Sequence, residues 1–286
     1  MLSEKAPSRI PVSRTVLCSP DAPLVSLALV HRGIFRKKSD VFLRGIAMTQ
    51  PIARDPIYRK RVFPADIIGL CVRWYIPYRL SYRDLVEMMA ERGIKVAHST
   101  ILRWVTRYVP EFQNRWNRFS KTVGTSWRVD ETYLKIKAKW HYLYRGVDQH
   151  GKTVEFLLRR DRDIAAAQAF FRKALDSTLP RVPRKVTLDG HVSSHRALWL
   201  LRREHPCWRN VKVRTSKYLN NLIEQDHRAI KRRCASMAAF KSFKNAAITI
   251  AGIELAQRIR KGQFSFGRGR RRRGRSRKDE WALALA

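Results

Sequence analysis

The spacing of hydrophobic residues changes once along this chain, near Ser126, and that change limits the fold more than any other feature. Between residues 64 and 109 hydrophobic side chains recur every three or four positions, as on one face of a helix. From Ser126 onward, short segments rich in aromatic and β-branched residues alternate with further helical stretches. We therefore expect a small all-α domain followed by an α/β domain.

Three helices are expected in the first part, at residues 65–75, 82–92 and 99–108. Gly93 is expected to end the second helix and Pro110 the third. Two helices joined by a short turn with a glycine form the helix-turn-helix pattern, whose last helix enters the DNA major groove. A helical hairpin that only packs is the alternative. If these helices form a DNA-binding helix-turn-helix, the residues expected to contact bases are His98, Ser99, Thr100 and Arg103.

The second part predicts three strands, then a helix, a strand, a helix, a strand and two helices. This order is that of an RNase H-like domain, a mixed sheet with flanking helices. We place it at residues 122–262, after a helix-turn-helix domain at residues 58–115. The expected segments are 127–136, 140–147, 153–158, 164–176, 185–188, 194–204, 211–214, 220–236 and 246–260.

A large excess of positive charge runs through the whole chain. Lys and Arg number 60 against 23 Asp and Glu, which gives a net charge of +37 over 286 residues. Self-repulsion of this size destabilises a compact state unless a polyanion offsets it. Nucleic acid is such a partner, because each phosphate that a basic side chain neutralises releases a condensed counterion. A solvated basic surface without a partner is the alternative.

Cysteine usage and hydrophobic content exclude other classes of protein. The four cysteines are isolated, with no CxxC pair, which argues against a disulfide framework and against a zinc knuckle. No segment reaches the ~18 apolar residues that a membrane span needs, and no signal peptide is recognisable. We expect a cytoplasmic, nucleoid-associated protein with no membrane contact.

Both ends of the chain differ in composition from the rest. Residues 1–57 carry Pro, Ser and scattered charges without a sustained period, which indicates a disordered leader. Alternatively, translation starts at Met48 and residues 1–47 are not native. Residues 263–286 include a low-complexity run of arginines, which is typical of a disordered tail that binds phosphates without sequence preference.

Three carboxylates stand out in a chain with few acids. Asp130 lies inside the first expected strand, Asp189 directly follows the fourth, and Glu224 lies near the start of a long helix. A buried carboxylate is costly unless it is paired or binds a metal. Oxygen ligands suit Mg²⁺, or Mn²⁺ in its place, and two such ions can hold the attacking and leaving oxygens of a phosphodiester displacement. Each acid taken alone is more simply an ordinary surface residue.

Residues near these acids were also weighed as site residues. Helical spacing puts Glu224, His227, Arg228 and Lys231 on one face, so that Arg228 and Lys231 can reach DNA phosphates. Glu131 and Asp226 adjoin the predicted site, and we expect them to pair with nearby Arg or Lys rather than to bind metal.

Several segments together resemble the insertion-sequence-six family of DDE transposases over about residues 58–262. They are WRVDETYLKI, HYLYRGVDQHG, VTLDG, KYLNNLIEQDHRAIKRR, FKSF and AGIE. The family's triad falls on Asp130, Asp189 and Glu224, with the 34 residues between the last two that the family shows. Its basic residue seven positions after the Glu falls on Lys231, which the resemblance places among the catalytic residues.

The resemblance implies more than the residues alone do. It implies binding to terminal inverted repeats, Mg²⁺ dependence, strand cleavage and transfer by a replicative, cointegrate-forming route, and a homo-oligomer on terminal and target DNA. A helix-turn-helix regulator without catalysis would explain the charge but not the three acids. An RNase H-like nuclease that hydrolyses without joining, and an inactive copy, also remain open from the residues.

Overall fold

The computed structural model describes residues 55–59, 62–216, 221–235, 237, 240–266 and 276–285. Most of the expected leader and the run 267–275 therefore lie outside the described residues. No helix in the described ranges is both long and apolar enough to cross a membrane.

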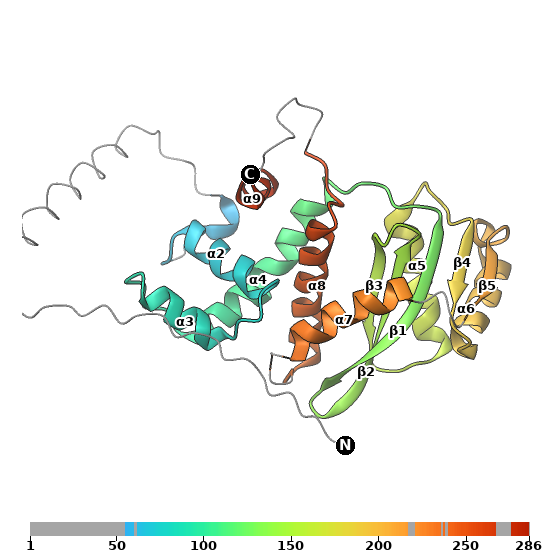
Figure 1. Ribbon diagram of the computed structural model, residues 1–286, viewed down its shortest axis with the longest axis horizontal. Coiled ribbons are helices and arrows are strands. Elements are labelled where there is room, and N and C mark those ends of the chain that lie inside the picture. The colour runs from blue at the N-terminus through green and yellow to red at the C-terminus, as the bar shows by residue number, and fades with distance from the viewer. Residues whose placement is uncertain are drawn as a thin grey trace, which may run out of the picture. The chain divides into compact units, whose positions relative to one another are not determined.

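A five-stranded mixed sheet forms the centre of the α/β part, with strand order β3-β2-β1-β4-β5 (Figure 1). The first three strands are antiparallel neighbours, whereas β4 and β5 run parallel to β1. This is the topology of an RNase H-like sheet, and the predicted fold class is confirmed. The strands are β1 Ser126–Ile136, β2 Lys139–Asp148, β3 Thr153–Arg159, β4 Lys185–Leu188 and β5 Lys212–Thr215.

Helices precede the sheet and flank it. They are α2 Ala65–Tyr75, α3 Tyr82–Ala90, α4 His98–Asn117, α5 Ile164–Thr178, α6 Val192–Glu204, α7 Asn221–Ala235, α8 Phe243–Arg260 and α9 Arg277–Leu285, with 3-10 turns at η1 Pro56–Tyr58 and η2 Pro206–Trp208. The Ser81 side chain accepts hydrogen bonds from the backbone of Arg83 and Asp84 and so caps α3.

Strand β1 contributes to two cores because successive side chains point to opposite faces of the sheet. Trp127 and Val129 are buried in the core that includes residues of α5 and α6. Leu134 and Ile136 are buried in a second core with residues of α7 and α8. The buried positions are thus odd-numbered at the start of β1 and even-numbered at its end, and the change falls at Asp130 and Glu131.

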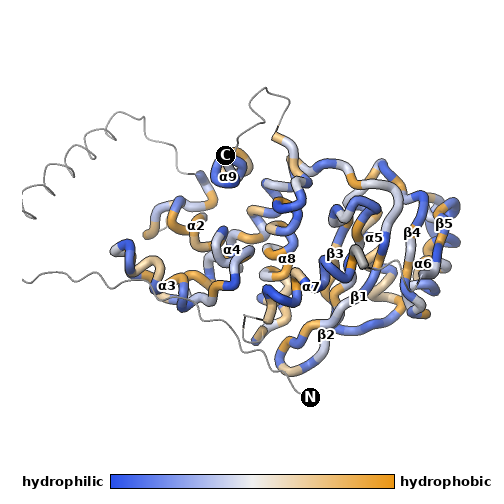
Figure 2. Tube along the Cα trace, in the orientation of Figure 1, coloured by the Kyte–Doolittle hydropathy of each residue, from blue (hydrophilic) through white to orange (hydrophobic). Residues whose placement is uncertain are grey.

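Helix α8 lies between the N-terminal helices and the sheet (Figure 1). It is hydrophobic on more than one side, since Leu255 and Ile259 pack with the N-terminal helices while Ile250 and Ile253 pack towards the sheet. Gly252 allows the close approach: a Cβ there would lie 2.7 Å from the Ile76 side chain and 3.2 Å from Val109. Hydrophobic residues also predominate along α2, which joins the same core (Figure 2).

Helix α4 continues past Pro110, so the predicted end at that residue is wrong. A proline inside a helix removes one backbone hydrogen bond and crowds the preceding turn. The residues beyond it offset that cost, because Phe112 and Trp116 are fully buried in the core of the helical part. The helix therefore extends to Asn117.

The C-terminal end is partly folded, contrary to the expectation of a disordered tail over residues 263–286. Arg277–Leu285 forms α9, and the Trp281 ring packs edge-on against Trp116 with centroids 5.0 Å apart. Phe264 also packs on Trp116, at 4.7 Å. At the other end, Tyr58 is buried, so the expected disorder up to residue 57 is wrong for the turn at residues 56–58. The aromatic residues of these two segments are isolated among polar residues, so no hydrophobic period predicted that the segments would fold.

A buried ion network joins the sheet to two helices. Arg145 on β2 is fully buried, and its Nε and Nη2 donate to Glu254 of α8 at 2.6 and 3.1 Å. The same Nη2 donates to Asp226 of α7 at 3.1 Å, and Lys261 also pairs with Asp226. Burial alone would lower the pKa of Arg145, but the two carboxylates outweigh it and raise that pKa. The pairing predicted for Asp226 is confirmed.

We expect Glu254→Gln to destabilise the protein by about 3–5 kcal/mol, because the variant leaves the buried Arg145 charge poorly compensated. Glu204→Gln is the matched control: Glu204 pairs with Arg172 on the surface, and loss of such a pair costs under about 1 kcal/mol. Urea unfolding of both variants measures the difference. A Glu254→Gln protein within about 1 kcal/mol of the wild type would contradict this account.

Candidate active site

Asp130 and Asp189 are brought together by the pairing of β1 with β4. The two strands are parallel and Val129 lies opposite Leu188, so the next residue on each strand is an aspartate. Carboxylate oxygens of Asp130, Asp189 and Glu131 all lie within 4.8 Å of one another. Two residues that are 59 positions apart in the chain (189 − 130) thus form one acidic cluster.

Glu131 belongs to this cluster but already has two partners. Its carboxylate accepts hydrogen bonds from Arg162 Nη2 at 2.9 Å and from Ser194 Oγ at 2.5 Å. Being next to Asp130 on a strand, it points to the face of the sheet that carries α5 and α6. The predicted pairing of Glu131 with a nearby arginine is confirmed. Arg162 also approaches Asp189 Oδ2, at 3.7 Å.

The cluster is electrostatically unfavourable as it stands. The pKa of Asp130 is raised to about 6, chiefly by burial and also by the charges of Asp189 and Glu131, and this is the net result after the opposing effects of the Glu131 backbone N–H and Arg162. One arginine faces three carboxylates. A divalent cation bound by oxygen ligands would relieve this repulsion, so the residues present fit Mg²⁺ or Mn²⁺.

Glu224 lies outside the acidic cluster. It is exposed in the first turn of α7, and residues 217–220 just before it are not described. Three residues later on the same helix, His227 places Nδ1 3.7 Å from Asp130 Oδ2. The helix therefore passes beside Asp130, but Glu224 is not among the carboxylates within 4.8 Å of the two aspartates.

His227 is a site residue to which the sequence assigned no role. Burial, Arg145 and Lys231 lower its pKa to about 3, so the imidazole is neutral at pH 7. Its contact with Asp130 is therefore no ion pair, and 3.7 Å is too long for a hydrogen bond. Its position on the face of Glu224 was visible in the helical spacing; its burial depends on β1 and could not be read from that spacing.

The residues predicted to contact DNA lie on two elements. Arg228 and Lys231 are exposed on α7, and Lys231 Nζ lies 4.7 Å from the centre of the Tyr133 ring. The others lie in the first two turns of α4, where His98 and Arg103 are exposed and Ser99 and Thr100 are partly buried.

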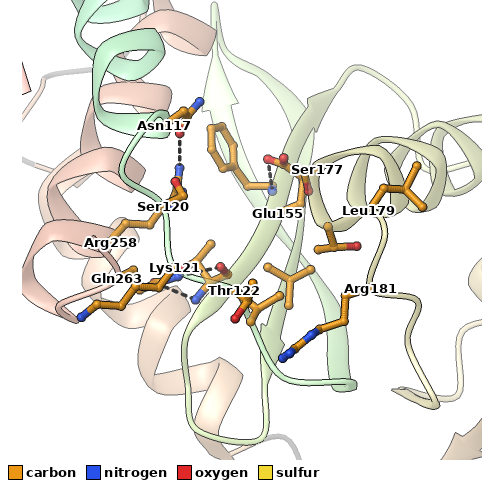
Figure 3. A pocket seen from close by; sticks show the side chains of 15 residues that line it. Asn117, Ser120, Lys121, Thr122, Glu155, Ser177, Leu179, Arg181, Arg258 and Gln263 are labelled. Carbon is orange, nitrogen blue, oxygen red and sulfur yellow. Dashed lines mark hydrogen bonds between the residues drawn. The ribbon is translucent and has the colours of Figure 1, made fainter. Parts of the chain in front are cut away.

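A cavity of about 420 Å³ lies elsewhere, between the linker that follows α4, the start of β3 and the end of α5 (Figure 3). Arg258 borders it and donates to Asn117 Oδ1 at 2.8 Å and to Ser120 Oγ at 2.7 Å. None of the residues predicted for the site lines this cavity, so the cavity is distinct from the acidic cluster.

Comparison with known proteins identifies the family of the chain. Residues 124–263 match a family model described as a DDE domain. The chain is 41% identical over 203 residues to the transposase for insertion sequence-like element IS431mec of Staphylococcus aureus, covering 69% of this chain and 85% of that protein. It is 40% identical, with the same coverage, to the transposase for insertion sequence element IS257 in transposon Tn4003 of Staphylococcus aureus.

Solved structures with some likeness include the HTLV-2 integrase catalytic core domain in complex with magnesium, in its trimeric form. It has 18% identity and a TM-score of 0.35, and the match covers 46% of this chain and 84% of that chain. The Mos1 strand transfer complex has 12% identity and a TM-score of 0.29, covering 81% of this chain and 71% of that one. On the sequence identity and the matching DDE domain, the chain belongs to the insertion-sequence-six family of DDE transposases.

Proposed function

We propose that this protein binds the terminal inverted repeats of an insertion sequence and catalyses metal-dependent DNA strand cleavage and strand transfer by a replicative, cointegrate-forming route. The observation that carries the proposal is the meeting of Asp130 and Asp189 at the β1–β4 pairing, in a chain that belongs to a transposase family. The strong positive charge supports a DNA partner, and the proposed place of action is the nucleoid in the cytoplasm.

In this proposal Asp130, Asp189 and Glu224 hold the metal. Bound Mg²⁺, or Mn²⁺ in its place, supplies Lewis acidity at the scissile phosphate. Asp130 and Asp189 bind from the sheet, which the paired strands make rigid. Glu224 binds from α7, whose position depends on the neighbouring Asp226 and its pairing with Arg145.

The reaction is a displacement at phosphorus in both of its stages. Water first attacks the phosphorus and the P–O3′ bond breaks, which leaves a 3′-hydroxyl and a 5′-phosphate. That hydroxyl then attacks a target phosphodiester, and the target's own P–O3′ bond breaks so that its 3′-oxygen leaves as a hydroxyl. Arg228 and Lys231 neutralise the phosphates on either side of the site from the exposed face of α7. His227 contacts Asp130 as a neutral group and so adds no charge to the site.

We further propose that α2–α4 form the DNA-reading domain, with α4 as the recognition helix. Support comes from the cap of α3, the short turn at Gly93 and the exposure of His98 and Arg103 at the start of α4. Two ends of an element must be held together for transposition, so we propose that the protein works as a homo-oligomer on DNA.

We expect Asp130→Asn, Asp189→Asn and Glu224→Gln each to reduce strand cleavage and transfer by about 10³-fold or more, because each removes a charged ligand from the site. DNA binding should persist, since α4 is a separate element. Asp176→Asn, at an exposed position on α5, is the control and should retain full activity. The measurement is a strand-transfer assay on the element's own ends with Mg²⁺ and with EDTA. Near-normal cleavage by Glu224→Gln would remove that residue from the site.

We expect Arg103→Ala to lower the preference for terminal repeats over random DNA by about 5- to 150-fold, which is the loss of one base contact worth ~1–3 kcal/mol. Replacing Arg270–Arg273 by Gln should reduce affinity for both DNAs and weaken the salt dependence. Substitution is preferable to deleting the tail, because α9 packs on Trp116. Binding titrations at several salt concentrations compare the two variants. If the tail variant alone loses sequence preference, α4 is not the reading helix.

A further inference from the structure

The hairpin formed by β1 and β2 exposes two large aromatic side chains beyond the acidic cluster. Tyr133 is 55% exposed and Trp140 is 54% exposed, whereas Trp104, Trp116, Trp127, Trp208 and Trp281 are buried. The two rings meet edge to face, with centroids 5.3 Å apart and an interplanar angle of 84°. Tyr and Trp are enriched at binding interfaces, so this exposed pair is a candidate binding surface.

Lysines surround the aromatic pair. Lys231 Nζ lies 4.7 Å from the centre of the Tyr133 ring, and Lys135 Nζ lies 5.4 Å from the centre of a Trp140 ring. We call Tyr133, Lys135, Trp140 and Lys231 the hairpin patch. Residues 132–147 contain no Asp or Glu, and neither lysine forms an ion pair within the described residues. A negatively charged ligand with a flat apolar face would complement the patch.

The patch is held rigidly. Ten residue pairs join β1 to β2, and the turn between them has positive φ at Lys137 (49°) and Ala138 (62°). Such a conformation is uncommon without glycine and persists only where surrounding contacts fix it. The contact here is with Phe240, whose carbonyl accepts a hydrogen bond from Lys137 N at 2.9 Å. The aromatic pair is thus a fixed platform rather than part of a loose loop.

The patch lies along the two elements that carry the proposed catalytic acids. Tyr133 is three residues beyond Asp130 on β1, which is roughly 10 Å along a strand. Lys231 is seven residues beyond Glu224 on α7, which is also roughly 10 Å along a helix. A DNA strand that places one phosphate at the acids would therefore reach the patch within a few nucleotides.

We propose that the hairpin patch binds an unpaired nucleotide of the DNA strand next to the active site, with its base stacked on Trp140 and Tyr133 and its phosphates near Lys135 and Lys231. Bases inside a duplex already stack on their neighbours, so only an unpaired or terminal base offers a free face. Stacking on aromatic rings beside basic side chains is a general way of binding single strands. The proposal rests on the proposed function and adds to it a site for unpaired DNA.

The test measures binding of the full chain in EDTA, where no strand is cut. One probe is a blunt duplex of the terminal repeat; the other is the same duplex with a short unpaired extension that carries 2-aminopurine. We expect Trp140→Ala to weaken binding of the extended probe by about 5- to 150-fold, the value of one stacked base, while binding of the blunt probe stays the same. Trp140→Phe should keep most of the preference and the change in 2-aminopurine fluorescence.

Trp199 supplies the matched control. It is a second exposed tryptophan, at 42%, on α6, with the guanidinium groups of Arg196 and Arg203 4.0 and 4.8 Å from the ring centre. Trp199→Ala should leave both probes unaffected. Equal losses in the two variants, or no loss in Trp140→Ala, would overturn the proposal. So would a Trp140→Ala protein that keeps the probe preference but falls to a lower mass in light scattering, because the patch would then pack against a second copy.

The outcome can be separated from that of the proposed function. If Asp130→Asn still transfers strands, the proposed catalytic site is wrong whatever the patch binds. If Asp130→Asn is inactive and Trp140→Ala binds both probes like the wild type, only the patch proposal fails.

Discussion

The buried pair between Arg145 and Glu254 is the interaction on which the positions of the other elements depend. It fixes α8, which supports the N-terminal helices on one side, to the sheet that carries Asp130. Through Asp226 the same arginine also fixes α7, the helix of Glu224 and Lys231. A buried charge is tolerated only with well-placed partners, so arrangements of these three elements that leave Arg145 unpaired are disfavoured.

Much of the fold could be predicted from the sequence because its signals are local. The periodicity change near Ser126 predicted the division into a helical part and an α/β part that the structure contains. The end of α4 could not be predicted from local signals. The helix continues past Pro110 because Trp116 is buried against residues that are distant in the chain. The helix in the tail could not be predicted for the same reason, because its packing partners are distant in the chain. The Arg145–Glu254 pair spans 109 residues, and no local pattern indicates it.

The site residues also divide into those that the sequence could place and those that it could not. Asp130 and Asp189 could be placed together because each marks a strand position and the expected topology puts those strands side by side. Glu224 was predicted from the resemblance and from helical spacing, and the structure sets it on the helix beside Asp130 without bringing it into the acidic cluster. Glu131 occupies the third place there, but Arg162 and Ser194 already bind its carboxylate. Whether Glu224 or Glu131 completes the proposed metal site therefore depends on whether α7 contributes a ligand.

Mn²⁺ binding, followed by electron paramagnetic resonance of the free ion in the full chain, answers it most directly. We predict that Asp130→Asn, Asp189→Asn and Glu224→Gln each weaken Mn²⁺ binding by at least about tenfold. Glu131→Gln should weaken it less, because the Glu131 carboxylate accepts hydrogen bonds from Arg162 and Ser194. The contrary result is a Glu224→Gln protein that binds Mn²⁺ like the wild type together with a Glu131→Gln protein that does not bind it. That result would mean that the metal is held by the cluster on the sheet alone and that α7 carries no ligand.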